Sequence, residues 1–343
     1  MTDKEKSDAC TRLNEKSIPF ADQLRAAATM MILLCHFCAQ KEGFLFNAAS
    51  QVLNIGVPLF FILSGFLFGR KGVHIPYRKW FFRRLQRLWI PYWLFLAVLA
   101  IIYLAKNLNV LTVDWLLLLF GLQGSVVGVW GAEQTWFISA LLICYGLTPG
   151  IAKVAERVER KHVPYVLIIL STLPALLLLM KPAAIGTLLA PIFLYAAAYF
   201  IGSGIVTVKI NGLGACIAST IVFLSFALRF VLRLYFDGTV FYSGIVATYT
   251  HYAAALAIFY LFAWFFAERK PARIVSFFGE ISFEVYLYHN MFTGGPVSVF
   301  GATKFWSVNC ILAFSITLII ATVMHYIGKN AAKCIFTKEG LHR

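Results

Sequence analysis

Two ionisable side chains on one apolar, helix-length segment near the start of the chain could do acid–base chemistry. Arg25 and His36 lie eleven residues apart within Asp22–Phe37. Eleven residues nearly close three helical turns, so both side chains share one face, roughly 16 Å apart along the axis. Asp22 lies one turn before Arg25, and we expect the two to form an ion pair. The alternative is that the arginine side chain reaches the membrane–water interface and that the histidine has only a structural role, with its ring nitrogens hydrogen-bonded inside a helix bundle.

The composition indicates what kind of protein holds this segment. Of the 343 residues, 60% are hydrophobic and 13% are charged, and the mean hydropathy is +0.79. These values are typical of a polytopic membrane protein, in which an ionisable residue within a span usually marks a site or a pathway. The net charge of +15 fits basic cytoplasmic loops better than a nucleic-acid partner, so we expect no nucleic acid.

The seven cysteines show no framework of disulfide or metal-ligand spacing. Cys35 and Cys38 form a CxxC pair, but inside an apolar helix and without a second pair. We interpret them as small hydrophobic residues of the bundle and expect no metal. The first twenty residues are polar and charged, and we expect no cleavable signal peptide.

The apolar segments predict an all-α protein of about ten transmembrane helices, with both termini in the cytoplasm. The whole chain, 1–343, forms one domain in this interpretation, with cytoplasmic tails at 1–19 and 328–343. The expected spans lie at about 22–40, 46–69, 88–106, 134–150, 163–180, 183–207, 212–236, 242–267, 274–294 and 304–327.

The distribution of basic residues sets the orientation of these spans. The segments 70–88, 152–162 and 268–273 are rich in Lys and Arg and should face the cytoplasm. The apolar run 110–123 is short for a span and contains Asp114. If this run crossed the membrane, the basic segment 152–162 would lie outside, against the preference of Lys and Arg for the cytoplasmic side. We therefore predict that 110–123 forms an interfacial or re-entrant helix.

Five segments in order resemble the acyltransferase-3 family of integral-membrane acyltransferases. Each segment alone is a weak signal, but the ordered set covers nearly the whole chain. They are D-x-L-R-x10-H from Asp22 to His36, V-P-L-F-F-I-L-S-G from Val57 to Gly65, R-R-L-x-R-x-x-x-P-Y-W from Arg83 to Trp93, W-F-x3-L-x3-Y-x3-P from Trp136 to Pro149, and I-S-F-x-x-Y-L-x-H from Ile281 to His289.

The resemblance implies a membrane O-acyltransferase. Such enzymes transfer acyl groups, usually acetyl from acetyl-CoA, to sugars of lipid-linked or cell-surface glycans. Many members have glutamates shortly after the tryptophan at 136, where this chain has Leu141 and Leu142. The chain is similar instead to the shorter branch without an appended domain, which includes surface-polysaccharide O-acetyltransferases.

The chemistry of acyl transfer assigns roles to the first site residues. A sugar hydroxyl is a poor nucleophile near neutral pH and needs a base, and histidine suits that task. His36 is the candidate, either as a base for the acceptor or as the carrier of the acyl group. Arg25 could steady a thioester oxygen or a CoA phosphate, and Asp22 would pair with it.

A second group of residues is expected to bind the acyl-CoA donor. Arginine matches phosphate oxygens with paired donors, and Arg84 and Arg87, one turn apart, can point together beside Arg83. The alternative is that these arginines only set the topology. Ser64 and Gly65 could bring backbone close to the pantetheine arm, or could form a small-residue helix contact.

The expected span 274–294 supplies the acceptor side. Ser282, Tyr286 and His289 recur on one helical face and, with Trp136, are expected to line the acceptor path. Glu284 lies on another face of the same helix, without an assigned partner. His251 matches no motif and is interpreted as structural.

The predicted protein is thus a multi-pass enzyme of the cell inner (cytoplasmic) membrane of a bacterium. Its partners are the lipid bilayer, acyl-CoA and a glycan or lipid-linked sugar acceptor. Acetyl-CoA would be a co-substrate, and no bound cofactor is expected. The alternative is a secondary transporter or exporter, although no pair of broken helices in matching halves supports it. A sensor or receptor is a third possibility, without a signalling domain in its favour.

Overall fold

The computed structural model describes residues 18–72, 76–124, 128–180 and 183–336, and every regular element in these ranges is a helix. The first half comprises α2 (Pro19–Ala39), α3 (Phe44–Leu53), α4 (Gly56–Lys71), α5 (Tyr77–Ala105), α6 (Val113–Leu119), η1 (Glu133–Thr135), α7 (Trp136–Arg157), η2 (Arg160–His162) and α8 (Val163–Leu179). The second half comprises α9 (Ala183–Gly202), α10 (Gly212–Phe236), the π-helix η3 (Phe241–Val246), α11 (Ala247–Phe266), α12 (Arg273–Glu280), α13 (Ser282–Thr293) and α14 (Trp306–Phe336).

Eight helical stretches in the described part of the chain are long and apolar enough to cross a membrane. This confirms the prediction of an all-α polytopic membrane protein. They are Phe44–Lys71, Tyr77–Ala105, Glu133–Arg157, Arg160–Leu179, Ile185–Gly202, Gly212–Phe236, Phe241–Phe266 and Trp306–Cys334.

Two further segments would bring the number of spans to the predicted ten. Helix α2 has 21 residues, which cover about 31 Å, enough for a hydrocarbon core of about 30 Å. Helices α12 and α13 follow one another with a break at Ile281. The count of ten and the cytoplasmic location of both termini stay predictions.

Several boundaries differ from those that the hydropathy pattern predicted. The basic stretch expected as a loop before residue 88 is mostly helical, because α5 begins at Tyr77, directly after Pro76. Arg and Lys favour helices, and proline is well placed at a helix start, so nothing ends the helix earlier. Helix α14 likewise continues to Phe336, nine residues beyond the predicted end at 327.

The segment 110–123 forms only the short helix α6. Its seven residues cover about 10 Å, which is too short to cross a bilayer. The helix folds back along α5, where Tyr92 and Trp93 donate hydrogen bonds to the carbonyls of Leu118 and Leu119 at 2.6 and 3.1 Å. The prediction that this segment does not form a span therefore agrees with the structure.

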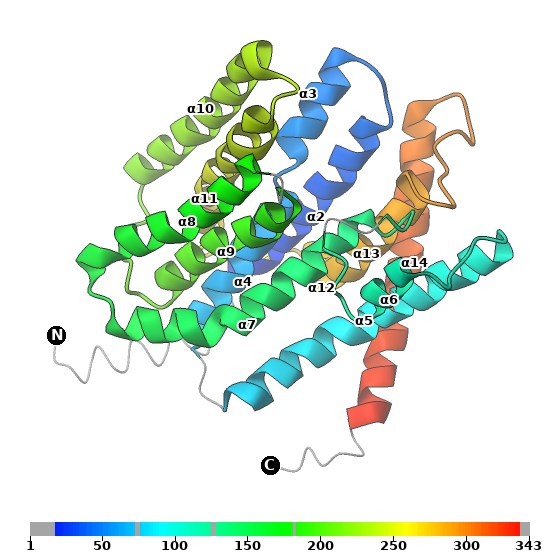
Figure 1. The fold of residues 1–343 in the computed structure, drawn as a ribbon, viewed down its shortest axis with the longest axis horizontal. Coiled ribbons are helices and arrows are strands. Elements are labelled where there is room, and N and C mark those ends of the chain that lie inside the picture. The colour runs from blue at the N-terminus through cyan, green and yellow to red at the C-terminus, as the bar shows by residue number, and fades with distance from the viewer. Residues whose placement is uncertain (1–17, 73–75, 125–127, 181–182, 337–343) are drawn as a thin grey trace.

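Helices α4 and α9 pack with their backbones in close contact. A Cβ added at Gly65 or Gly69 would overlap the carbonyl oxygen of Tyr195 or Tyr199 on α9. Gly202 meets the carbonyl of Phe66 in the same way. Small residues allow such approach in membrane bundles, where apolar side chains gain little from leaving lipid. This pair of helices lies at the centre of the bundle, with α8 and α10 on one flank and α5 and α14 on the other (Figure 1).

Most of the helix ends that carry basic residues lie on one side of the bundle, and Arg233 in the last turn of α10 is an exception. In Figure 1 the end of α4, the start of α5 and the ends of α7 and α14 all lie toward the lower edge. The loop between α2 and α3 and the end of α10 lie toward the upper edge. This arrangement agrees with a membrane orientation in which the lower side is cytoplasmic.

The ten-span topology predicts which side of the membrane each loop faces. In a cysteine-depleted background, a cysteine at exposed Glu156, near the end of α7, should not react with an impermeant thiol reagent added to intact cells. A cysteine at exposed Glu42, in the loop after α2, should react and serves as the positive control. Labelling at 156 from outside would mean that α6 crosses or that the orientation is inverted.

Candidate active site

Two histidines from distant parts of the chain meet inside the bundle. The imidazole rings of His36 on α2 and His289 on α13 lie with their centroids 4.8 Å apart, tilted by 47°. His289 is fully buried, whereas His36 is partly exposed. His36 is therefore the member of the pair that a substrate could reach first.

Helix α2 is positioned beside the broken helix α12–α13 along its whole length. At one end, a Cβ added at Gly279 would lie 2.9 Å from the carbonyl oxygen of Asp22. At the other end the two imidazoles meet. Thr29, one turn beyond Arg25, is buried, and its hydroxyl donates to the Arg25 carbonyl at 2.9 Å. The face of α2 that carries Arg25 and His36 is thus packed on α12 and α13.

The short helix η1 fixes the register of α13. Gln134 donates its Nε2 to the Leu287 carbonyl at 2.6 Å, and its own carbonyl accepts the Tyr286 hydroxyl at 2.5 Å. Glu133 accepts Asn290 Nδ2 at 2.6 Å. Three successive contacts on about one turn of α13 hold the helix that carries His289.

The tautomer of His289 follows from its own hydrogen bond. Its Nδ1 lies 2.6 Å from the carbonyl oxygen of Tyr286, which can only accept, so Nδ1 carries the proton. The neutral ring then has its lone pair on Nε2. That nitrogen is buried and has no hydrogen-bond partner among the described residues.

Aromatic side chains form a wall beside the two histidines. The ring of Tyr286 lies 5.8 Å from His289, 5.2 Å from Phe137 and 6.5 Å from Phe60. Trp136 is partly exposed, and its ring lies 6.5 Å from that of Phe61, which lies 4.9 Å from Phe137. Of the four residues expected on the acceptor path, Tyr286 and His289 are in direct contact.

Ser282 occupies a separate position from the histidine pair. It is buried at the first residue of α13, about two turns before His289. No hydrogen bond joins it to the pair among the described contacts. Its place on the same face of the helix agrees with the predicted spacing, but it does not reach the rings.

Arg25 lies away from His36, toward the start of α2. Its Nη1 donates to Asp22 Oδ1 at 2.8 Å, in the ion pair that the spacing predicted. Both side chains are about one-third exposed. Since eleven residues separate Arg25 from His36, roughly 16 Å along the helix, Arg25 does not contact the imidazole.

The predicted donor-binding arginines lie on the first turns of α5. Arg84 is partly buried, with its guanidinium 4.7 Å from the ring centre of Phe68 and 5.9 Å from that of Trp80. Arg83 and Arg87 are exposed. None of the three has a carboxylate within ion-pair distance in the part of the chain that the structure describes. Their charges therefore remain open to an anion.

Ser64 and Gly65 lie on α4, facing different surroundings. Gly65 is buried against the Tyr195 carbonyl, the small-residue helix contact described above. Ser64 is partly exposed. The tight packing leaves no room for a further chain at Gly65 itself.

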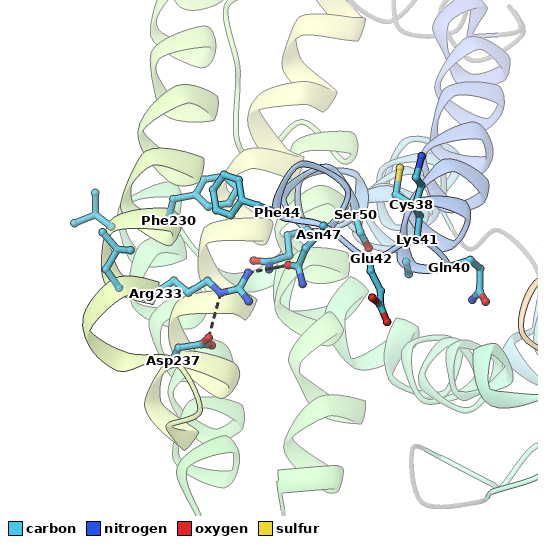
Figure 2. Close-up of a pocket in the computed structure, with 15 residues that line it drawn as sticks. Cys38, Gln40, Lys41, Glu42, Phe44, Asn47, Ser50, Phe230, Arg233 and Asp237 are labelled. Carbon is cyan, nitrogen blue, oxygen red and sulfur yellow. Dashed lines mark hydrogen bonds and ion pairs between the residues drawn. The ribbon is translucent and has the colours of Figure 1, made fainter. Parts of the chain in front are cut away.

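A large cavity opens at the other end of α2. It has a volume of about 1350 Å³ and lies between the α2–α3 loop, α3 and the end of α10. Arg233 donates to Asn47 Oδ1 at 2.9 Å and pairs with Asp237 at 3.4 Å on one wall (Figure 2). Gln40, Lys41 and Glu42 stand on the opposite side (Figure 2). We refer to it as the outer cavity.

Gln40 connects the outer cavity with the histidine pair. It lines the cavity, and it follows His36 by four residues, directly after the last residue of α2. A Cβ added at Gly294, just beyond α13, would lie 3.6 Å from Gln40 Nε2 and 3.7 Å from Asn290 Oδ1. Gln40 therefore stands between the rim of the cavity and the end of the helix that carries His289.

Two polar clusters were not predicted from the sequence. Glu284 accepts His325 Nδ1 at 2.8 Å, and the same histidine lies 3.5 Å from Glu280, which pairs with Lys329. His251, interpreted as structural, bonds the Gln51 carbonyl at 2.8 Å. The sequence signal for the first cluster is that His325 lies one helical turn before Lys329, near the end of the last span.

The comparisons with known proteins give one match. A protein-family model described as an acyltransferase domain matches residues 18–326. No curated protein and no solved structure matches the chain. Within the described residues, no cluster of three His, Cys, Asp or Glu side chains could hold a metal ion.

The buried Glu284–His325 pair should matter far more for stability than the exposed Glu280–Lys329 pair. His325→Ala leaves the Glu284 carboxyl buried without its partner, which should lower the free energy of unfolding by about 3–5 kcal/mol. Lys329→Ala breaks an ion pair between two half-exposed side chains and should cost at most about 1 kcal/mol. Thermal melting of the purified variants in detergent compares them, and equal melting temperatures for both would contradict the prediction.

Proposed function

Because the chain belongs to the acyltransferase-3 family of membrane acyltransferases, we propose that it moves an acyl group, in the simplest case acetyl, from cytoplasmic acyl-CoA to a sugar hydroxyl. Membership of this family makes the chain an acyltransferase rather than a transporter. The observation that carries the finer proposal is the contact of His36 and His289. This pair lies between the outer cavity and the end of the bundle that carries the basic first turns of α5, which we call the basic end.

The donor is proposed to bind at the basic end. CoA carries a 3′-phosphate and a pyrophosphate, for which arginine supplies paired donors. Arg84, placed over Phe68, and the exposed Arg83 and Arg87 have no carboxylate partners in the described chain, which supports this assignment. Arg25 is too far from His36 to contact the reacting carbonyl, so we assign it to the phosphate end of the donor, with Asp22 orienting its guanidinium through their ion pair.

The acceptor is proposed to bind through the outer cavity. Its lining combines amide side chains, paired charges and the rings of Phe44 and Phe230. Amide side chains can donate hydrogen bonds to sugar hydroxyls and accept hydrogen bonds from them, and carboxylates accept hydrogen bonds from sugar hydroxyls. Gln40 would then guide one hydroxyl from the cavity toward His36. A glycan or lipid-linked sugar fits this description, and the α2–α3 loop that lines the cavity lies at the opposite end of the bundle from the start of α5 (Figure 1).

The proposed reaction starts with His36 as general base. One ring nitrogen takes the proton of the acceptor hydroxyl while the oxygen attacks the thioester carbonyl. The C–S bond then breaks, and the departing thiolate takes the proton from the imidazolium, which leaves an ester, free CoA thiol and neutral His36. The transfer needs no net exchange of protons with water. Histidine suits this role because its ordinary pKa lies near neutral pH.

This proposal places the enzyme in the cytoplasmic membrane of a bacterium, with acetyl-CoA as a co-substrate and no bound cofactor. The acyl group and the acceptor are tested by deleting the gene and measuring the masses of the surface glycans of the host. Loss of a mass equal to an acetyl group would support acetyl transfer to a glycan, and a different acyl mass would correct the donor. Unchanged glycans, together with unchanged acetyl-CoA consumption by membranes, would contradict the proposal.

Replacement of His36 should abolish acyl transfer. His36→Ala and His36→Gln should both lower the rate at least 10²-fold, because positioned acid–base catalysis contributes about 10²- to 10⁴-fold. The measurement is CoA thiol release by the protein in proteoliposomes, with acetyl-CoA binding measured in parallel and expected to be retained. His162→Ala, a change at an exposed histidine, is the control. If His36→Gln kept most of its rate, His36 would be a packing residue. Radiolabel from acetyl-CoA that stays on the protein would indicate an acyl-histidine route instead.

Replacement of the donor arginines should weaken use of acetyl-CoA. Arg84→Ala with Arg87→Ala removes two charge-assisted contacts, which should cost about 2–5 kcal/mol of donor binding and raise KM accordingly. The matched control removes two positive charges from the end of α7, with Lys153→Ala and Arg157→Ala. If both double variants kept the parental KM for acetyl-CoA, the arginines of α5 would serve the membrane topology alone.

A further inference from the structure

The buried imidazole of His289 holds an unpartnered nitrogen beside the proposed base. Its Nδ1–H is committed to the Tyr286 carbonyl at 2.6 Å, so Nε2 has a lone pair to offer. Nε2 is buried and has no hydrogen-bond partner in the described chain. A buried acceptor without a hydrogen-bond partner destabilises the folded protein, so the position of this nitrogen beside His36 indicates a role beyond packing.

The geometry of the two rings suits a hydrogen bond between them. A bond of about 3 Å between ring nitrogens puts two imidazole centres about 5 Å apart. The centroids of His36 and His289 are 4.8 Å apart, a separation compatible with such a bond once the partly exposed His36 ring turns one N–H toward Nε2.

No other side chain in the described chain donates a hydrogen bond to Nε2 of His289. The charged and titratable groups packed around the rings are engaged elsewhere in the described structure. Glu284 pairs with His325 on another face of α13, Glu133 accepts from Asn290 and the Gly131 amide, and the Tyr286 hydroxyl donates to Gln134. No carboxylate lies within ion-pair distance of either His36 or His289 in the described chain.

We propose that His289 is the positioning residue of a histidine–histidine dyad, in which its Nε2 accepts a hydrogen bond from the ring N–H of His36. This inference rests on the proposed function of His36 as base. The bond fixes which nitrogen of His36 faces the acceptor and steadies the imidazolium that forms when the acceptor loses its proton. A neutral imidazole thereby does what a carboxylate does in a Ser–His–Asp triad.

The dyad assigns the proton at each stage of the reaction. Before transfer, His36 has its proton on the nitrogen that faces His289 and a lone pair toward the acceptor. During attack, the acceptor proton joins that lone pair, and the first proton stays in the bond to His289. When the C–S bond breaks, the acceptor proton passes to the thiolate. His289 stays neutral throughout, with its own proton on Nδ1.

Two nearly isosteric variants test the role of His289. Glutamine keeps a strong acceptor, whereas methionine has similar size and only a weak one. The expected kcat of His289→Gln is within about tenfold of the parent, and that of His289→Met is at least 10²-fold lower, both with the parental KM for acetyl-CoA. Size-exclusion profiles and melting temperatures identify folded protein. If both variants fell equally, or neither fell, the dyad would be wrong.

A spectroscopic readout tests the dyad independently of activity. In protein labelled with ¹⁵N-histidine and reconstituted in lipid, the ring signals of His36 are assigned from their loss in His36→Gln. The expected result is one hydrogen-bonded N–H on His36, whose proton resonance shifts in His289→Met and not in the control His251→Gln. Unchanged His36 signals in His289→Met would overturn the proposal. If the bond were present but His36→Gln stayed active, the proposed function would fail while the dyad geometry stood.

Discussion

Polar groups inside a membrane bundle must find partners within the protein, because hydrocarbon offers none. Helix neighbours here follow this constraint. Arg229, buried in α10, donates to the Ala247 carbonyl at 2.8 Å, where the π-helix η3 passes into α11. Glu284 on α13 binds His325 on α14 at 2.8 Å. Each of these contacts joins two neighbouring helices. Apolar surfaces alone would allow the two helices to shift along one another, so the buried polar pairs specify their register.

The need to pair buried polar groups also accounts for the break between α12 and α13. Ending one helix at Glu280 and starting the next at Ser282 lets α13 adopt its own position beside α2. Two neighbours then hold α13: the Gln134 side chain binds the Leu287 carbonyl on one side, and His325 binds Glu284 on the other. A helix of twelve residues anchored in this way has little freedom to shift. The ring that it presents to α2 is therefore the fixed member of the histidine pair.

Much of this fold was predictable from the sequence, because hydropathy reports the length of a span directly. The predicted span 212–236 coincides with α10, and the segment 110–123 forms only a short helix. The contacts between helices were not predictable. The spacing of Arg25 and His36 placed both on one face of α2, but periodicity does not say which helix faces them, so the meeting of His36 with His289 and the partner of Glu284 appeared only in the structure.

An imidazole partner has a physical advantage over a carboxylate at this depth. A buried aspartate beside His36 would introduce a charge into the apolar interior before any substrate binds, at a cost of several kcal/mol. Neutral His289, satisfied at Nδ1 by a backbone carbonyl, introduces none. In the proposed reaction, positive charge arises on His36 only as the acceptor oxygen and the thioester develop negative charge next to it. The opposite charges then appear together and disappear together, so the site is charged only while the reaction proceeds.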